Sequence, residues 1–428
     1  MTSRLIRGRL LSFKDVPRDI DDTSSYSYEE DGAVLTTDGV IIASGDYARV
    51  KQQAPAEAIA IDHRPHLMMP GFIDTHLHFP QMQVIGSYAA ALLEWLNTYT
   101  FVEEQKFVDP VHAARIATAF FDELVRHGTT SAVAYCSVHK SSAEAFFSES
   151  HRRNFRMIAG KVMMDRNAPP ALLDTPQSGY DDTKAIIEEW HGKGRQMVAI
   201  TPRFAITSSP EQLDMAGALM REFPDLHMQT HLSENHAEIA FTKELYPQHH
   251  DYVAVYDHYS LLGPKSLFGH SIHLSDREAD AMSASGSVAV FCPTSNLFLG
   301  SGLFDLKTLD ERDDPVRIAI ASYSMLRTLD EGYKILQLQG QRMTPLESFY
   351  RITLGNARAL SLEDKIGSIE PGREADMVVL NAGATPAMAL RMETVTKLSE
   401  ELFLLQTMGD DRAIVETYVA GEPAKSVL

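Results

Sequence analysis

The sequence predicts an α/β protein: a (β/α)₈ barrel with a small β-sandwich domain formed by the N- and C-terminal segments. Two observations support this architecture. In the middle of the chain, strand-like segments alternate with helical patterns, as in a barrel of parallel strands. The terminal segments contain short strands and turns without long helical periodicity. We therefore expect a composite β-domain from residues 1–67 and 366–428, and a barrel from residues 68–365.

The predicted barrel strands are short segments rich in apolar residues. They are Gly71–Leu77, Thr130–Cys136, Met157–Met163, Met197–Arg203, His227–Leu232, Ser266–His273, Val288–Cys292 and Arg317–Ala321. Helical patterns between them are Val111–His127, Thr183–His191, Pro210–Phe223, Asn235–Leu245 and Asp276–Ser283. In such a barrel, functional residues gather at the C-terminal ends of the strands and in the loops that follow.

The terminal segments are expected to pair with each other. Arg4–Phe13 and Gly39–Ile42 have the pattern of strands, whereas Tyr26–Gly32 and Thr36–Asp38 look like turns or loops. Strand patterns return at Asp376–Leu380 and Ala413–Val419, near the other end of the chain. One small β-domain built from both ends follows, with the barrel inserted between its halves.

Composition narrows the possible partners. The chain has 428 residues and a formal net charge of -19, which disfavours binding to the phosphate backbone of a nucleic acid. Its two cysteines, Cys136 and Cys292, are too few and too far apart for a disulfide framework or a cysteine-based zinc motif. The start of the chain lacks the apolar core of a signal peptide, and no apolar run reaches the ~18 residues of a membrane span. We expect a cytoplasmic protein.

The segment PGFIDTHLHFP, residues 70–80, carries the first candidate ligands. Side chains alternate along a strand, so His76 and His78 point to the same side. Two neighbouring imidazoles can occupy two corners of a tetrahedral zinc site. A His-x-His pair is also compatible with two half-buried structural histidines, so this pattern alone leaves both interpretations open.

Polar residues also end the fifth and sixth predicted strands. His231 is placed to be a third metal ligand, and Glu234 to act as a general acid and base beside the metal. Glu234 could instead be a surface carboxylate at the start of the next helix. His270 could orient a water molecule on the metal, whereas strand alternation turns His273 away, and we interpret His273 as structural.

Three residues are candidates for binding a planar ring. Arg203 can donate to a carbonyl or ring nitrogen, Phe204 can stack on a ring face, and Gln81 offers both a donor and an acceptor. Each of them could equally have a structural role. Some barrel hydrolases bridge two metals with a lysine of the fourth strand, but here Lys161 lies on the third, so we expect one metal.

These residues lie in longer motifs through which the chain resembles the amidohydrolase superfamily and, within it, the guanine deaminase family. The general motifs are Pro70–His78 and Gly367–Val379. The narrower ones are LEWLNTYTFVE (93–103), KVMMDRNAP (161–169), TPRFAITSS (201–209) and FCPTSNLFLGSGLF (291–304). The resemblance extends from about Arg4 to Val419.

The resemblance implies zinc-dependent hydrolysis of guanine to xanthine and ammonia by a homodimer, with one zinc per chain and iron as another possible metal. It assigns metal binding to His76, His78 and His231. It assigns guanine binding to Gln81, Arg203 and Phe204. Glu234 corresponds to the proton shuttle, and His270 to the histidine near the metal-bound water.

One departure from the family pattern concerns the eighth strand. The family ends this strand with an aspartate in a Thr-Asp-x-Gly-Gly-Gly-like loop, but here Arg317–Ala321 runs directly into Ser322–Leu326. We favour a segment missing from this sequence between Ala321 and Ser322; a true deletion would leave a three-histidine site. Two other functions stay open: a deaminase or chlorohydrolase for another amino-substituted heterocycle, and a non-catalytic barrel scaffold.

Overall fold

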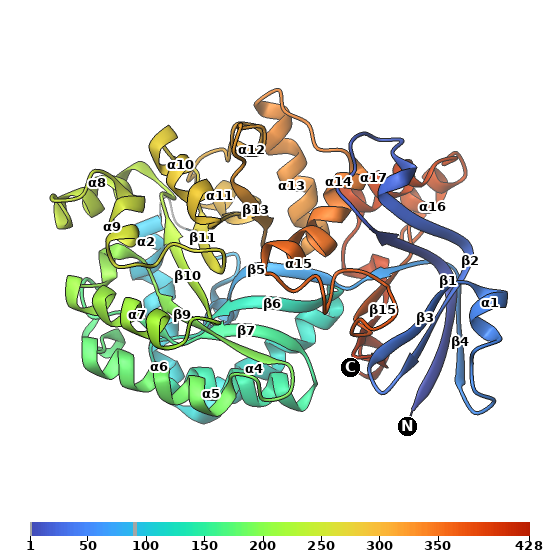
Figure 1. Cartoon of the computed structure of the whole chain (residues 1–428), viewed down its shortest axis with the longest axis horizontal. Coiled ribbons are helices and arrows are strands. Elements are labelled where there is room, and N and C mark those ends of the chain that lie inside the picture. The colour runs from blue at the N-terminus through green and yellow to red at the C-terminus, as the bar shows by residue number, and fades with distance from the viewer. Residues whose placement is uncertain (1, 89–91) are drawn as a thin grey trace.

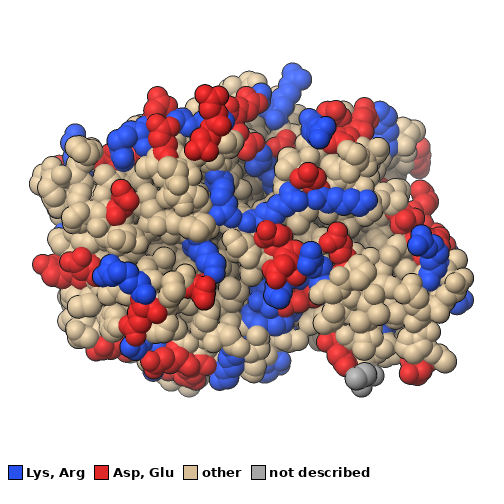
Figure 2. Space-filling view, viewed as in Figure 1, with Lys and Arg blue, Asp and Glu red and all other residues tan. Residues whose placement is uncertain are grey.

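The computed structural model describes residues 2–88 and 92–428. It confirms the predicted fold class, because a parallel barrel and a separate sheet built from both ends of the chain lie side by side (Figure 1). Acidic and basic side chains are interspersed over the face drawn in Figure 2. Among the described residues, no helix is both long enough and apolar enough to cross a membrane.

Eight parallel strands form the barrel, and each pairs with the next along the chain. They are β5 (Phe72–His78), β6 (Thr129–Tyr135), β7 (Arg156–Gly160), β9 (Gln196–Pro202), β10 (His227–Leu232), β11 (Ser266–His270), β12 (Val288–Phe291) and β13 (Arg317–Ile320). The short strand β8 (Val162–Met163) also pairs with β9. The sixth strand is shorter than predicted, because His270 and Ser271 adopt φ angles of 69° and 47°, which end the extended backbone.

Helices cover the outside of the barrel. The longer ones are α4 (Pro110–Arg126), α5 (Lys140–Arg152), α6 (Pro176–Trp190), α7 (Pro210–Glu222), α8 (His236–Leu245), α10 (Asp276–Ser285) and α13 (Met325–Leu338). The shorter ones are α9 (Tyr252–His258), α11 (Pro293–Phe298), α12 (Leu306–Asp310), α14 (Pro345–Tyr350) and α15 (Asn356–Ala359). Helix α6 begins earlier than predicted because Thr175 and Ser178 form a capping box before it.

A helical segment between β5 and α4 approaches the C-terminal ends of the strands. It consists of α2 (Leu92–Trp95), a π-helical turn (Leu96–Thr100) and α3 (Phe101–Glu104). Turns of π-helix often occur at functional sites. This segment contributes apolar residues to the wall of the cavity described below, and a buried carboxylate that contacts two residues of that wall.

The side chain of Asn356 bridges the first and last barrel strands. Its Nδ2 donates to the carbonyl oxygens of Ile73 on β5 and Ile320 on β13, both at 2.7 Å. Its Oδ1 accepts from the Ile320 amide at 2.9 Å. The hydroxyl of Thr75 donates to the same Ile320 carbonyl at 3.1 Å. Side-chain hydrogen bonds thus connect the two strands where the ladder of paired strands ends.

The N-terminal half of the barrel interior is filled with small and branched apolar side chains. Its buried members include Cys292, Ala321, Ala359, Ile73, Val133, Ile158, Ala199, Leu267, Val288, Val290, Ala319, Ala357, Leu360, Leu362 and Ile366. The last four come from α15 and the residues after it, which close this end of the barrel. The open space therefore lies at the opposite end, where the strands finish.

The second sheet has seven strands in the order β16-β15-β14-β4-β1-β2-β3. They are β1 (Ser3–Phe13), β2 (Tyr26–Thr37), β3 (Val40–Asp46), β4 (Ile59–Pro70), β14 (Met377–Leu380), β15 (Ile414–Val419) and β16 (Glu422–Pro423). Strand β4 pairs with β1 on one side and β14 on the other, so both chain ends build one sheet, as predicted.

The prediction of a loop at residues 26–32 was wrong, because these residues begin β2 and pair with β1. A strand with one solvent-facing side tolerates the charged residues of this segment. Strand β4 continues to Pro70 and β5 begins at Phe72, which leaves only Gly71 between sheet and barrel. A Cβ on Gly71 would lie 2.2 Å from the Thr130 hydroxyl, so glycine is required there. Division of the chain at 67/68 and 365/366 remains our proposal.

Candidate active site

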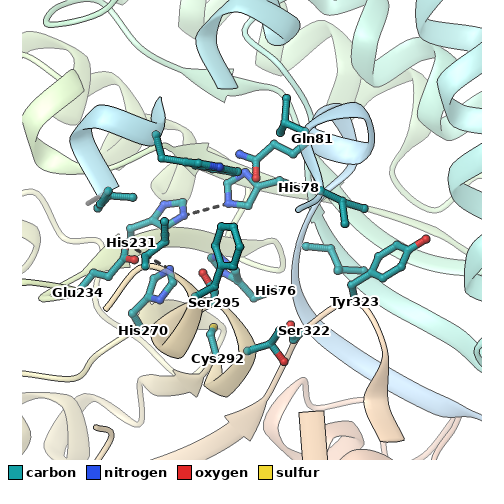
Figure 3. Close-up of a pocket in the computed structure, with 18 of the residues that line it drawn as sticks. His76, His78, Gln81, His231, Glu234, His270, Cys292, Ser295, Ser322 and Tyr323 are labelled. Atoms are coloured by element: carbon teal, nitrogen blue, oxygen red, sulfur yellow. Dashed lines mark hydrogen bonds and ion pairs between the residues drawn. The ribbon is translucent and has the colours of Figure 1, made fainter. Parts of the chain in front are cut away.

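A cavity of about 310 Å³ opens at the C-terminal ends of the barrel strands (Figure 3). All eight residues selected from the sequence line it: His76, His78, Gln81, Arg203, Phe204, His231, Glu234 and His270. They come from β5, β9, β10 and β11 and from the residues that follow these strands. Strand alternation predicted the common direction of His76 and His78, and the position of the other residues at or just after strand ends predicted that they would lie nearby.

Three imidazoles meet at one side of the cavity. The Nε2 atoms of His78 and His231 lie 3.0 Å apart, and one ring nitrogen each of His76, His78 and His231 lie within 4.8 Å of one another. The Nδ1–H of His231 donates to the Arg203 carbonyl at 2.7 Å, which leaves its Nε2 lone pair facing His78. A metal-binding histidine is oriented by the same kind of bond.

Burial lowers the pKa of all three histidines well below the usual value, and the repulsion that a protonated ring would meet from Arg203 or from a protonated neighbouring histidine lowers it further. The imidazoles are therefore neutral, which is the state that binds a metal. His76 also needs space, and Gly269 on β11 provides it. A Cβ at this glycine would lie 2.5 Å from Cε1 of His76.

Glu234 and His270 lie next to each other beyond β10 and β11. Nε2 of His270 is 3.5 Å from Glu234 Oε2, and the Ser301 hydroxyl donates to Glu234 Oε1 at 2.9 Å. The Nδ1–H of His270 donates to Asn296 Oδ1 at 2.8 Å. Asn296 and Ser301 were not predicted as site residues, although both belong to the 291–304 motif. The 291–304 motif was the only feature of the sequence that could have indicated these two residues.

The loop that carries Glu234 is fixed by a second carboxylate. Glu238 Oε2 accepts from the backbone amide of Glu234 at 2.7 Å and from that of Asn235 at 3.1 Å. Burial, and then the charge of Glu234, raise the pKa of Glu238 to about 8. The two backbone bonds hold the main chain at the position from which the Glu234 side chain enters the cavity.

Arg203 and Gln81 share one buried partner, Glu104. Glu104 Oε2 lies 2.6 Å from Arg203 Nη1, and Gln81 Nε2 donates to Glu104 Oε1 at 3.3 Å. No pattern in the sequence predicted a role for Glu104, which is one residue beyond the 93–103 motif. Phe204 follows Arg203, and its ring centroid lies 6.2 Å from that of His231. The two polar groups and the aromatic ring thus enter the same cavity.

Residues 67–424 match the amidohydrolase family. The chain belongs to the amidohydrolase family. It is 46% identical to the guanine deaminase of Escherichia coli (strain K12) over 429 residues, which cover 98% of this chain and 97% of that protein. It is 37% identical to the probable guanine deaminase of Deinococcus radiodurans, with 89% of this chain and 90% of that protein covered. The family resemblance of the motifs is thereby confirmed.

Comparison with solved structures also matches this chain to guanine deaminases. The structure of E. coli guanine deaminase matches this amidohydrolase with a TM-score of 0.94 and 45% identity, and covers 98% of this chain and 99% of that one. Guanine deaminase from C. acetobutylicum, solved with guanine in its active site, matches with a TM-score of 0.86 and 28% identity. That match covers 99% of this chain and 100% of the other.

Among the described residues of this amidohydrolase, two histidine-containing groups have donor atoms close enough to hold a cation. One is His76, His78 and His231, and the other is His76, His270 and Cys292. Neutral imidazoles whose second nitrogen is fixed by a carbonyl or amide oxygen fit a divalent metal such as zinc. Lys161 is not part of the cavity, since its ammonium pairs with Asp174 at 2.7 Å.

His273 also lies away from the metal candidates. Its Nε2–H donates to the Ser301 carbonyl oxygen at 2.8 Å, and the hydroxyl of the same serine bonds Glu234. We interpret His273 as a structural residue, as the sequence predicted, that supports the segment behind Glu234.

The end of β13 differs from the family pattern in this amidohydrolase. The strand ends at Ile320, and residues 321–324 alone connect it to α13. Residues 317–328 read RIAIASYSMLRT and contain no carboxylate. Ser322 has a φ of 155°, a backbone conformation that residues other than glycine rarely adopt. This short connection is therefore strained. Ser322, Tyr323 and Arg327 line the cavity where the family pattern has its aspartate.

The amide of Ser322 donates to both carboxylate oxygens of Asp74, at 3.2 and 3.3 Å. Asp74 also accepts from the His76 amide at 3.1 Å. Burial raises the pKa of Asp74 to about 8. Asp74 is absent from the residues that line the cavity, so we interpret it as a residue that holds β5 and the end of β13 together.

Proposed function

We propose that this amidohydrolase is a metal-dependent guanine deaminase, which hydrolyses guanine to xanthine and ammonia. The observation that carries the proposal is the pairing of Arg203 and Gln81 through Glu104, opposite three neutral histidines and Glu234. This arrangement combines ring recognition with hydrolytic chemistry in one small cavity. The full-length similarity to guanine deaminases supports the choice of guanine.

We propose that His76, His78 and His231 hold a single divalent cation. Imidazole ligands suit zinc and also accept iron. When bound, such a cation lowers the pKa of a coordinated water to ~7 and so supplies a nucleophile at neutral pH. The neutral state of the three rings favours this occupancy.

Glu234 would move the protons. Glu234 would take a proton from the attacking water and pass it to the ring nitrogen beside the amino-bearing carbon. A C–O bond forms; Glu234 would then take the second proton from the new hydroxyl group and deliver it to the amino group, so that the C–N bond breaks, a carbonyl forms and ammonia leaves. Zinc nucleobase deaminases of a different fold also use one glutamate as acid and base. His270 would orient the carboxylate, with Asn296 fixing its ring.

Arg203 and Gln81 would bind the edge of guanine, and Phe204 would cover one face. Arg203 donates hydrogen bonds to carbonyl and ring-nitrogen acceptors, while the Gln81 amide presents a donor and an acceptor. Leu92, Trp95 and Leu96 add an apolar wall that excludes water from the reacting ring. A cavity of about 310 Å³ suits a single base. We further propose a cytoplasmic homodimer that acts on a small molecule and binds neither nucleic acid nor membrane.

The test is ammonia release from guanine, with xanthine formation followed by ultraviolet absorbance. The protein should be assayed as purified and after addition of zinc, against cytosine, an aminotriazine and an adenosine thioether. The proposal expects turnover of guanine above the others. Turnover of another ring alone would favour a related deaminase or chlorohydrolase. Absence of a stoichiometric metal together with absence of turnover would favour a barrel scaffold.

A further inference from the structure

Tyr256 connects the segment that carries Phe204 to the strand that carries His231. It lies on α9, in the crossover from β10 to β11, and its side chain is fully buried. Tyr256 is not among the residues that line the cavity, and no sequence pattern selected it. Any effect that it has on the site must therefore act through its neighbours.

The hydroxyl of Tyr256 makes three hydrogen bonds. It donates to the carbonyl oxygen of His231 at 2.8 Å and accepts from the backbone amide of Ala205 at 3.0 Å. The hydroxyl of Thr230 forms the third bond, also at 3.0 Å. One buried hydroxyl thus joins the end of β10 to the residue that follows Phe204.

Phe204 lies between two peptide groups that are both connected to His231. Before it, the Arg203 carbonyl accepts from the backbone amide of His231 at 3.1 Å and from its Nδ1–H at 2.7 Å. After it, the Ala205 amide is connected to the His231 carbonyl through Tyr256. The backbone of Phe204 is extended, with φ -171° and ψ 166°, so the place of its ring depends on both connections.

The ring of Tyr256 is held by packing that does not involve its hydroxyl. It stacks on Tyr252 at a centroid distance of 5.5 Å and an interplanar angle of 21°, and it contacts Phe268 of β11 at 5.6 Å. Burial raises the pKa of Tyr256 above its usual value, so the hydroxyl stays protonated at neutral pH. The hydroxyl can therefore donate and accept from a constant position.

The carbonyl groups of the same segment are held from another direction. Nη2 of Arg166 donates to the Ala205 carbonyl at 3.0 Å, and Nδ2 of Asn167 donates to the Ile206 carbonyl at 2.7 Å. Both side chains belong to the 161–169 motif after β7. These two bonds fix the segment to a neighbouring loop, but neither of them reaches β10.

We propose that Tyr256 is a positioning residue that sets the place of Phe204 relative to His231, and so the place of the substrate ring relative to the metal-binding histidines. The inference rests on the function proposed above, because it takes Phe204 as a substrate-binding residue. Loss of the hydroxyl should weaken guanine binding more than it slows the chemical step. Glu234 and His270 are oriented by other residues, Glu238 and Asn296.

Tyr256→Phe removes the hydroxyl and keeps the ring. In the zinc-loaded variant the Michaelis constant for guanine should rise about 10-fold, while kcat changes by less than about 3-fold. The metal content should stay that of the wild type, because the Arg203 carbonyl still orients the His231 ring. Tyr418→Phe is the matched control: Tyr418 is also buried, and its hydroxyl lies 2.7 Å from His63 Nε2 in the terminal sheet. This control should keep the wild-type Michaelis constant.

Residue-resolved hydrogen–deuterium exchange tests the same contact without substrate. The Ala205 amide should exchange as slowly as the amides of β10 in the wild type. It should exchange about 10-fold or more faster in Tyr256→Phe, but not in Tyr418→Phe. The wild-type measurement needs no variant, so it decides the question even where Tyr256→Phe fails to fold.

Fast exchange of the Ala205 amide in the wild type, or equal exchange in Tyr256→Phe, would overturn the proposal, because Arg166 and Asn167 would then hold the segment without Tyr256. An unchanged Michaelis constant in an active Tyr256→Phe, or loss of its metal, would overturn it as well. A zinc-loaded wild-type protein that does not turn over guanine contradicts the proposed function instead. The exchange rates still decide the role of Tyr256 in that case.

Discussion

Glu104 Oε2 lies 2.6 Å from Arg203 Nη1, and only 1% and 3% of these two side chains are exposed. The pair joins the helical segment after β5 to the end of β9, across 99 positions of sequence. A buried charge that loses its partner is strongly unfavourable, so each group fixes the other. Because Glu104 also accepts a hydrogen bond from Gln81, one carboxylate orients both side chains that are proposed to bind the edge of the substrate, Arg203 and Gln81.

Glu104→Gln is expected to raise the Michaelis constant for guanine about 10-fold or more, with a smaller effect on kcat. The amide can still accept from Gln81, but it cannot neutralise Arg203, whose guanidinium would then lose its fixed orientation. Steady-state kinetics on the zinc-loaded protein measures the effect. Glu103→Gln is the control, because Glu103 pairs with the exposed Lys106. An unchanged Michaelis constant in Glu104→Gln would show that Arg203 is held by other contacts.

Glu234→Gln is expected to retain metal and guanine binding but to lose about 10³-fold or more in kcat. The amide has nearly the same shape and can accept from Ser301, yet it cannot shuttle a proton. Metal content, equilibrium binding of guanine and single-turnover rates should be measured together. Glu244→Gln, an exposed change on α8, the helix that follows Glu234, should behave as wild type. Turnover near the wild-type rate in Glu234→Gln would remove this residue from the mechanism.

His78→Ala and His231→Ala are each expected to lower the bound metal well below one ion per chain and to abolish turnover. Each change removes one of two nitrogens that lie 3.0 Å apart, and a tetrahedral site with one ligand fewer binds more weakly. Elemental analysis after dialysis gives the stoichiometry. His250→Ala, at an exposed histidine, should keep the full metal content. Undiminished metal in both site variants would place the cation elsewhere.

Local patterns located the strand ends because strand alternation depends only on neighbouring residues. His76, His78 and His231 could therefore be selected from the sequence. Glu104 could not, because its role depends on a contact with Arg203 that only the folded chain creates. The limits of strands were also harder to predict where the backbone bends. The third strand breaks at Lys161, and the sixth stops at His270, which has a left-handed φ of 69°.

The terminal sheet shows the same distinction. Short strand patterns at both chain ends predicted that the two ends build one sheet. The pairing of β1 with β2 was not predicted, because residues 26–32 have the composition of a loop. The junction after β13 was visible in the sequence as a missing turn. The structure adds the strained φ of Ser322 that accompanies it.

Asn356→Leu is expected to reduce the free energy of unfolding by about 3 kcal/mol. The change removes three hydrogen bonds between α15 and the strands β5 and β13, and leaves buried backbone groups unpaired. Urea unfolding followed by circular dichroism measures the difference. Asn381→Ala is the matched control, since Asn381 accepts one bond from Gly383 within a local turn and should cost less than about 1 kcal/mol. Equal losses in the two variants would mean that Asn356 does not join the two strands energetically.

The contribution of His227 to the free energy of unfolding is expected to decrease at acidic pH. Burial lowers its pKa to about 4, although its Nε2–H bond to the Leu360 carbonyl at 2.9 Å opposes part of that shift. In the unfolded chain the pKa of the imidazole is near 6.5. Between about pH 6.5 and 4 the imidazole is therefore protonated in the unfolded state but neutral in the folded state. Stability from this group is therefore present above about pH 6.5 and is lost as the pH falls, by up to about 3 kcal/mol.

His227→Gln keeps a donor for the Leu360 carbonyl and removes the titration. Its unfolding free energy should fall by about 2 to 3 kcal/mol less than that of the wild type between pH 7 and pH 4.5. Chemical denaturation at a series of pH values measures both slopes. His250→Gln, a change at an exposed histidine, should leave the wild-type slope unchanged. Parallel curves for wild type and His227→Gln would show that this ring is protonated in the folded protein, in conflict with its burial at the closed end of the barrel.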